Sequence, residues 1–190
     1  MRPEKLNTVS LAHAFLSEYV RSGDLCIDAT MGRGNDTLFL CELVGEAGKV
    51  LAFDIQDEAL ESTKARLAEH GVTERATLIK QSHSEMTQYA ELGTVSAIIF
   101  NFGYLPGGDH NLATVPETSI TAIDAGLTLL KEGGVMCLCI YYGGDTGFSE
   151  RDALLAHLKN IDPKRYTVLL TDFYNRPNCP PMPIFIWKRI

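Results

Sequence analysis

Residues 25–36, LCIDATMGRGND, contain an apolar run, a glycine-containing turn and the start of a helix. The run LCIDAT at 25–30 has the length and apolar character of a buried strand. Gly32 and Gly34 allow the turn backbone to approach a ligand closely. Because open α/β sheets bind ligands at the carboxyl ends of their strands, the turn predicts a binding site. A purely structural turn is the alternative.

The alternation of strand and helix continues along the rest of the chain. Apolar runs predict further strands at 49–55, 76–80, 95–101, 135–142, 166–173 and 183–190. Helices are expected at 7–22, 36–44, 57–70, 117–131 and 149–160, the last capped by Ser149. Continuously apolar strands separated by helices indicate a parallel sheet that is covered on both faces. Residues 174–182 leave no room for a helix, so the last two strands are expected to pair as an antiparallel hairpin.

These elements predict a three-layer, doubly wound α/β fold with a seven-stranded sheet, parallel except for one antiparallel strand. The pattern resembles the class I S-adenosylmethionine-dependent methyltransferases, which have a Rossmann-like fold. Residues 1–190 are expected to form a single domain, because no linker or internal repeat divides them.

The composition excludes several classes of protein. Hydrophobic residues make up 45% of the chain and charged residues 22%, which are ordinary globular values. The chain lacks a signal-peptide pattern and a membrane-spanning apolar run, so a cytoplasmic protein without membrane contact is expected. Five cysteines, mostly within apolar runs, indicate reduced core thiols, and no spacing typical of metal ligands appears. A net charge of −7 argues against a broad, non-specific nucleic-acid binder.

The glycine turn also distinguishes between cofactors. A dinucleotide-binding fingerprint needs a third glycine at position 37, which is Thr37 here. A methyltransferase turn does not need it, because its cofactor has no pyrophosphate. The residues of the turn that we expect to contact such a cofactor are Asp28 and Asp36 at its ammonium group, Asn35 at its carboxylate, and Thr30, Gly32 and Gly34.

Polar residues also follow the second and third predicted strands. Asp54 can accept hydrogen bonds from both ribose hydroxyls, a feature that NAD and S-adenosylmethionine share. Ile55 and Gln56 would then flank the adenine. Ser82 and His83 are expected to border the same ring, and a surface histidine is an equal alternative for His83.

The stretch 101–110, NFGYLPGGDH, follows the fourth predicted strand and suggests chemistry at an amine. The Asn101 oxygen would accept a hydrogen bond from a target amine and aim the nitrogen lone pair at a methyl carbon, beside Phe102 and Gly103. Tyr104 would stack on the target or gate it. Asp109 is the first candidate to take the amine proton, and His110 is the second. These four polar residues, Asn101, Tyr104, Asp109 and His110, are the predicted catalytic set.

Two later segments are less specific. Residues 175–181, NRPNCPP, suggest either a substrate-facing loop or a rigid turn. Tyr141 and Tyr142 follow the fifth strand and are expected near the pocket. His13, His70 and His157 lie on predicted helices and are interpreted as surface or packing residues.

The segments DATMGRGNDT, AFDIQ, KQSH, FNFGYLPGGDH and NRPNCPP together resemble a bacterial rRNA methylase family that includes the tRNA 5-aminomethyl-2-thiouridine methyltransferases. The resemblance implies S-adenosylmethionine as donor and S-adenosylhomocysteine as product, a homodimer, and an RNA substrate. In the tRNA members the target is the aminomethyl group of the wobble uridine in the anticodon. The family pattern often has a histidine where this chain has Tyr142, so no role of that histidine carries over.

Several alternatives stay open at this point. An rRNA target, or a small-molecule amine, would keep the fold and the donor. An NAD-linked oxidoreductase is disfavoured by Thr37, and a non-catalytic RNA-binding module by the intact set of Asp28, Asp54 and Asn101. RNA binding requires a local basic patch on this acidic chain, for which the candidates are Arg33, Lys159, Lys164, Arg165, Arg176, Lys188 and Arg189.

Overall fold

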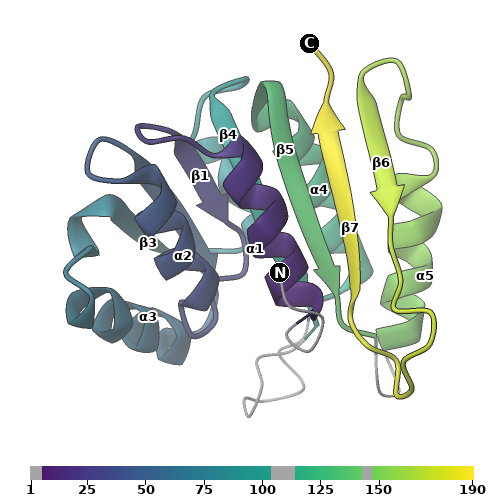
Figure 1. Cartoon of the computed structure of the whole chain (residues 1–190), viewed down its shortest axis with the longest axis horizontal. Coiled ribbons are helices and arrows are strands. Elements are labelled where there is room, and N and C mark those ends of the chain that lie inside the picture. The colour runs from purple at the N-terminus through teal and green to yellow at the C-terminus, as the bar shows by residue number, and fades with distance from the viewer. Residues whose placement is uncertain (1–5, 104–113, 143–146) are drawn as a thin grey trace.

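The computed structural model describes residues 6–103, 114–142 and 147–190. Seven strands form one sheet in the order β3-β2-β1-β4-β5-β7-β6 (Figure 1). They are β1 (Leu25–Asp28), β2 (Lys49–Asp54), β3 (Ala76–Lys80), β4 (Val95–Phe102), β5 (Leu130–Ile140), β6 (Tyr166–Leu170) and β7 (Met182–Lys188). All neighbouring pairs are parallel except the two that contain β7, which runs antiparallel to β5 and β6. The predicted sheet with one antiparallel strand is confirmed.

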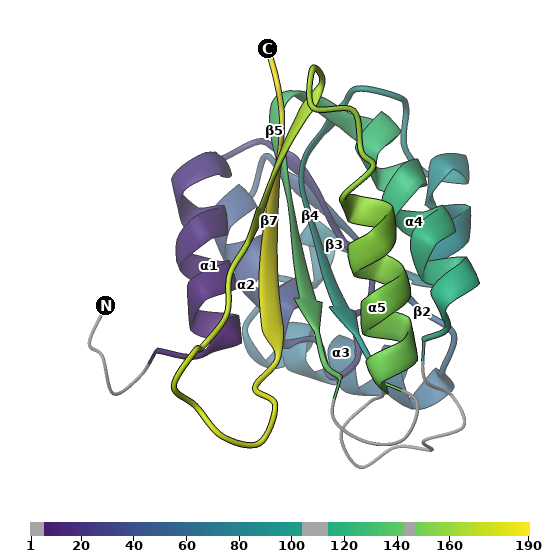
Figure 2. The same cartoon turned by 90° about the vertical axis from the view of Figure 1, so that its right-hand side faces the viewer.

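Helices cover both faces of the sheet, as Figure 2 shows with the sheet between two helical layers. One layer contains α1 (Thr8–Tyr19), α2 (Asn35–Val44) and α3 (Asp57–Glu69), and the other contains α4 (Pro116–Leu129) and α5 (Gly147–Leu158). Two short 3₁₀ helices, η2 (Thr73–Arg75) and η3 (His83–Gln88), flank β3 and were not predicted. None of the helices in the described ranges is long and apolar enough to cross a membrane.

Strand β4 shows why the apolar runs are continuous. Its residues alternate between the two faces, so Ile98 and Phe100 belong to the core beneath α4, whereas Ala97 and Ile99 belong to the core beneath α1 and α2. All four side chains are at most 1% exposed. A strand buried on both faces needs apolar residues at every position, which removes the polar–apolar alternation of a one-sided sheet.

Several predicted boundaries differ from the observed ones, and the largest difference comes from a strand pairing. The helix expected at 117–131 ends at Leu129, and β5 begins at Leu130 instead of 135, because Leu130 pairs with Val95 of β4. A register shift between Val95 and Ala97 accommodates the extra pairing. The predicted helix cap at Ser149 is also wrong, since α5 begins two residues earlier, at Gly147.

The cysteines mostly occupy the core, as predicted. Cys26, Cys41, Cys137 and Cys139 are buried, while Cys179 is exposed on the segment between β6 and β7. Among the described residues no group of three or more His, Cys, Asp or Glu side chains could hold a metal ion.

The strand order places a binding crevice at the centre of the sheet. From β1 the chain winds outward to β2 and β3, then returns to the other side of β1 with β4. The connections after β1 and β4 therefore leave the sheet on opposite sides, and this reversal opens a crevice at the carboxyl ends of the two strands. The glycine turn that follows β1 lies at this crevice.

Gly34 gives a testable prediction about the turn. Its φ is +75°, and a Cβ there would lie 2.7–2.9 Å from atoms of Thr63, including the Thr63 Cα. We expect Gly34→Ala to lower the free energy of unfolding by about 2–4 kcal/mol, from left-handed strain plus overpacking. Gly71→Ala is the matched control, because Gly71 also has a positive φ, +66°, but has nothing within 4 Å. Urea unfolding of both variants measures the difference, and equal losses would contradict the packing argument.

Candidate active site

A cavity of about 520 Å³ opens at the carboxyl ends of β1, β2, β3 and β4. Its wall is built from the loops after these four strands, with additions from α1, from Tyr141 after β5 and from the start of α4. The lining residues are Val9, Ala29, Thr30, Met31, Gly32, Arg33, Asn35, Asp36, Phe53, Asp54, Ile55, Gln56, Gln81, Ser82, His83, Asn101, Phe102, Gly103, Thr114, Val115, Thr118 and Tyr141.

The cavity brings together twelve of the fourteen residues predicted to contact a cofactor, namely Thr30, Gly32, Asn35, Asp36, Asp54, Ile55, Gln56, Ser82, His83, Asn101, Phe102 and Gly103. The other two, Asp28 and Gly34, do not line it. Of the predicted catalytic residues, Asn101 lines the cavity, whereas Tyr104, Asp109 and His110 lie outside the described residues. Tyr141 lines the cavity as expected, and the segment 175–181 does not.

Asp28 holds the turn in shape from behind the cavity wall. The side chain is 0% exposed, and its carboxylate accepts hydrogen bonds from the Thr37 hydroxyl at 2.6 Å and the Thr30 amide at 3.2 Å. Burial raises the pKa of Asp28 to about 7, and the negative charge of Asp36 adds to this increase. Thr37, which breaks the dinucleotide fingerprint, is therefore the hydroxyl partner of a buried acid.

Asp54 is fixed at the end of β2 by the same turn. One carboxylate oxygen accepts the Gly32 amide at 3.0 Å, and the other accepts the Gln56 amide at 3.0 Å. Each oxygen keeps a further lone pair for a ligand. Ile55, next in the chain, is 53% exposed and lines the cavity, which is unusual for a large apolar side chain unless a ligand covers it.

Asn101 and Asp36 are joined across the cavity wall. The Asn101 Nδ2 donates to Asp36 Oδ2 at 2.7 Å, and the Asn101 backbone amide donates to the Thr30 hydroxyl at 2.7 Å. The second Asp36 oxygen lies 2.6 Å from Nε2 of His13 on α1. The interpretation of His13 as a surface or packing residue is therefore incomplete, and no sequence spacing could show this pairing, which joins residues 23 positions apart.

His83 lies in the cavity wall, so of the two alternatives for it the ordinary surface histidine is wrong. Its ring makes edge contacts with Phe100 and Phe102, at centroid distances of 6.0 and 6.2 Å. Burial lowers the pKa of His83 to about 4, which the backbone of Ala29 partly offsets. The ring is thus neutral at pH 7, and its buried Nε2 has no hydrogen-bond partner among the described residues. A buried nitrogen without a partner costs free energy unless a ligand or water satisfies it.

Thr114 connects the cavity rim to α5. Its hydroxyl accepts the Gly103 amide at 2.9 Å and donates to Glu150 at 2.9 Å, while its own amide donates to the Gly103 carbonyl at 2.9 Å. The buried Glu150 carboxylate also accepts a hydrogen bond from Ser119 at 2.7 Å. Gly103 and Thr114 are consequently held side by side at the mouth of the cavity.

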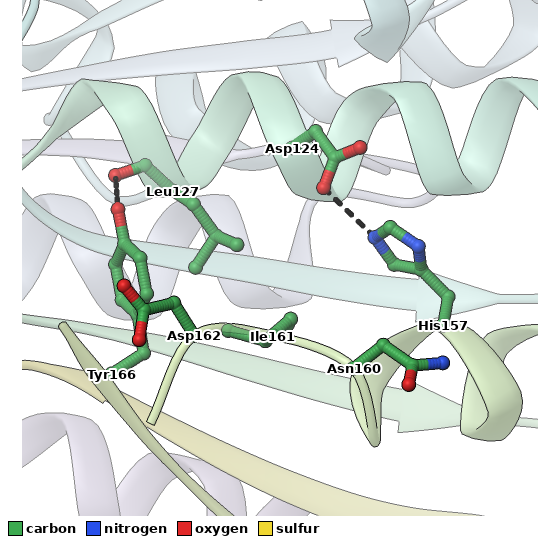
Figure 3. Close-up of a pocket in the computed structure, with 7 residues that line it drawn as sticks. All are labelled: Asp124, Leu127, His157, Asn160, Ile161, Asp162 and Tyr166. Carbon is green, nitrogen blue, oxygen red and sulfur yellow. Dashed lines mark hydrogen bonds and ion pairs between the residues drawn. The ribbon is translucent and has the colours of Figure 1, made fainter. Parts of the chain in front are cut away.

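A smaller cavity, of about 210 Å³, lies between α4, the end of α5 and β6 (Figure 3). Its polar side chains are paired with one another or with backbone: His157 Nε2 lies 2.8 Å from Asp124 Oδ1, and the Tyr166 hydroxyl donates to the Leu127 carbonyl at 3.0 Å. These contacts join helix to helix and strand to helix. They stabilise the packing of this layer, and His157 has the packing role that was one of its two predicted alternatives.

Comparison with known proteins identifies the family. Residues 50–187 match the model of a family described as "Putative rRNA methylase". The chain belongs to this rRNA methylase family. A relative from Arabidopsis thaliana, "tRNA (mnm(5)s(2)U34)-methyltransferase, chloroplastic", is 34% identical over 188 residues, which cover 94% of this chain and 68% of that protein.

Two solved structures agree with this assignment. A "putative rRNA-methylase" from Clostridium thermocellum is 46% identical with a TM-score of 0.94, covering 96% of this chain and 98% of that one. A "putative methyltransferase" from Streptococcus mutans, solved in complex with SAH, is 38% identical with a TM-score of 0.88 and the same coverage. The methylase is therefore an S-adenosylmethionine-dependent methyltransferase of class I fold. The oxidoreductase and the non-catalytic RNA-binding module are set aside.

The raised pKa of Asp28 predicts how stability depends on pH. The folded chain keeps the Asp28 proton up to about pH 7, whereas the unfolded chain releases it near 3.8. The unfolded state therefore binds fewer protons between these values, and the Asp28 contribution to stability falls as the pH rises. Asp28→Asn removes this pH-dependent contribution, because the Asn side chain does not titrate. The variant also loses hydrogen bonding, which lowers its stability equally at every pH.

We expect Asp28→Asn to become more stable relative to the unmodified chain as the pH rises from 4.5 to 7. The shift should approach about 1.4 kcal/mol per pH unit. Urea unfolding at several pH values measures it. A difference that stays constant across this range would mean that Asp28 titrates as in the unfolded chain.

Proposed function

We propose that this methyltransferase methylates an amine on RNA, namely the aminomethyl group of 5-aminomethyl-2-thiouridine at the tRNA wobble position. The observation that carries the proposal is the orientation of Asn101. Its Nδ2 is bound to Asp36, and its amide oxygen, in the cavity wall, accepts no hydrogen bond from any of the described residues. An acceptor at this position suits a target with N–H groups and a nucleophilic lone pair.

The cavity also suits the charge of the donor. Asp36 and Asp54 line it, and the buried Asp28 lies close enough for both to raise its pKa. The two lining carboxylates favour a cationic ligand over an anionic one, and a bound cation would also favour the ionised form of Asp28. S-adenosylmethionine, when bound, supplies an electrophilic methyl group on a sulfonium and leaves as S-adenosylhomocysteine.

In this proposal each part of the wall holds one part of the donor. Asp36 faces its ammonium group and Asn35 its carboxylate, with the backbone at Thr30 and Gly32 alongside. Asp54 accepts the ribose hydroxyls, for which its carboxylate is already oriented by two backbone amides. Ile55, Gln56, Ser82 and His83 enclose the adenine, and the unpartnered His83 nitrogen gives one hydrogen-bonding group for it.

The residues after β4 act on the amine. Asn101 accepts one amine hydrogen and fixes the nitrogen lone pair in line with the methyl group, beside Phe102 and Gly103. An alkylamine is mostly protonated at neutral pH, so one proton must leave before attack. We assign this proton to Asp109, with His110 as the second candidate, and stacking on the base to Tyr104. Most of the rate enhancement comes from positioning.

An RNA substrate is supported by the name of the Arabidopsis relative and by two basic residues at the edge of the sheet where the cavity opens. Arg33 lines the cavity, and Arg176 lies on the segment that joins the carboxyl end of β6 to β7, at the same edge of the sheet. The Arg176 guanidinium stacks on Phe173 at 4.1 Å, and the neighbouring Tyr174 is 97% exposed. An aromatic group beside a cation is a typical stacking surface for an unpaired base.

The other candidate basic residues are at the wrong end for the target base. Lys159, Lys164, Arg165, Lys188 and Arg189 follow α5, precede β6 or end β7, so they gather at the opposite edge of the sheet. The local basic patch predicted from the sequence is thus divided between the two opposite edges of the sheet. A homodimer would add a second set of basic residues near one RNA, and we include it in the proposal together with a single domain over 1–190.

One experiment tests donor, polymer and reaction together. The purified protein is incubated with methyl-labelled S-adenosylmethionine and with total RNA from cells that lack this protein. The labelled nucleoside is then identified by mass. We expect label in the aminomethyl wobble uridine of tRNA. Label confined to rRNA would overturn the tRNA target, and label in no RNA despite donor binding would favour a small-molecule amine.

Asn101→Ala should lower kcat by roughly 100-fold, because the amine loses its orienting acceptor. The dissociation constant of S-adenosylmethionine, measured by calorimetry, should stay within several-fold. Asn160→Ala is the matched control, since Asn160 bonds only its own helix end, at Ala156, beside the smaller cavity. An equal loss of donor affinity would make Asn101 a donor-binding residue instead.

Arg176→Gln should raise KM for RNA several-fold and leave kcat and donor affinity nearly unchanged, because the lost charge contacts RNA away from the reacting atoms. Arg165→Gln provides the control, since Arg165 also stacks on an aromatic ring, that of Tyr166 at 5.5 Å, but at the opposite edge. Steady-state kinetics at two salt concentrations measures both. Equal effects of the two variants would contradict an RNA-binding role for the cavity edge.

A further inference from the structure

We propose that His13 is a positioning residue, which acts through Asp36 to hold the Asn101 side chain in the orientation that accepts the target amine. The inference rests on the proposed function and extends it to a residue of α1. His13 does not line the cavity, although Val9, one helical turn earlier, does. Its effect must therefore pass through another side chain.

Two contacts with α2 fix the His13 ring. The ring stacks on Phe39 with a centroid distance of 3.7 Å and an interplanar angle of 1°, which sets its plane. Its Nε2 lies 2.6 Å from Asp36 Oδ1, which sets its direction within that plane. Asp36 and Phe39 are three positions apart on one face of α2, so a single helix provides both the stack and the acid.

The chemistry of a carboxylate then fixes every hydrogen in the chain of contacts. An ionised carboxylate only accepts hydrogen bonds, so both atoms that face Asp36 must be N–H donors. His13 therefore carries a proton on Nε2. Asn101 presents its NH₂ group to Asp36 at 2.7 Å, and its amide oxygen is left over on the other side. An amide is nearly symmetric in shape, so this electrostatic constraint, rather than packing, decides which end faces the target.

Loss of the His13 donor would release this constraint. Asp36 is 8% exposed, so an oxygen that loses its partner gains little hydration from solvent. The carboxylate would rotate to find another donor, and its bond to Asn101 would lengthen or be shared. Once that bond weakens, the amide of Asn101 can turn and present N–H to an incoming amine. Two donors facing each other cannot orient a lone pair.

Two substitutions separate the hydrogen bond from the packing. His13→Phe keeps an aromatic ring on Phe39 but has no donor, whereas His13→Gln loses the ring but keeps an N–H that can reach Asp36. We expect kcat for methyl transfer to tRNA from cells lacking the protein to fall roughly 10-fold or more in His13→Phe. His13→Gln should keep most of the kcat of the unmodified chain, with KM for RNA within about 3-fold in both variants. A packing role predicts the reverse order of the two variants and would overturn the proposal.

A second measurement needs no acceptor, so it separates this inference from the proposed function. In ¹⁵N-labelled protein, the two Nδ2 hydrogens of Asn101 should give distinct NMR signals that exchange slowly with solvent, because one is bound to Asp36. The signals should persist in His13→Gln and exchange much faster in His13→Phe. Unchanged exchange in His13→Phe would overturn the role of His13 even if RNA is methylated. If the signals respond as expected but no RNA is methylated, only the proposed substrate fails.

Discussion

The buried carboxylate of Asp28 is the constraint on which the site depends. It has no exposed surface and binds the Thr37 hydroxyl on α2 and the amide of Thr30 in the turn. Thr30 in turn accepts the backbone amide of Asn101 at the end of β4. One acid therefore ties together the end of β1, the start of α2 and, through Thr30, the residue proposed to bind the target. Removing a partner from such a network leaves buried polar groups unpaired, which is costlier than losing a single surface contact.

Negative charge is concentrated where we propose that the donor binds, although an RNA substrate would be repelled by it. The whole chain has a net charge of −7, and Asp36 and Asp54 add carboxylates to the cavity itself. A cationic donor gains from this potential, whereas phosphate groups must be held by exposed basic side chains, Arg33 at the cavity wall and Arg176 outside it. Binding of a cationic donor and binding of RNA phosphates are compatible because the electrostatic potential inside a small cavity differs from that on the surface around it.

Much of the fold follows from the sequence because helices and strands have different periods and because a sheet buried on both faces has continuous apolar strands. The strand at 76–80 was predicted with the bounds it has, since charged and polar residues limit it on both sides. The start of β5 was not, because the pairing of Leu130 with Val95 is a long-range contact that overrides the glycines at 133 and 134. The site residues after each strand were found because the topology brings carboxyl ends together. Asp28 was wrongly predicted to line the cavity, because its sequence position shows that it ends a strand but not on which side of the turn its side chain lies. The role of His13 was missed because nothing in the sequence of α1 indicates that this histidine faces Asp36.

The bond pair between Gly103 and Thr114 has a consequence for how this site can evolve. The two residues exchange hydrogen bonds and are anchored to α5 through the buried Glu150. Contacts outside the intervening segment therefore hold its two ends together. The entropic cost of closing a loop grows only slowly with its length, so a longer segment would add little to this cost. We therefore expect insertions and deletions between these two positions to leave the sheet intact. The sequence between the two positions is therefore free to vary while the proposed donor-binding residues after β1, β2 and β3 stay the same.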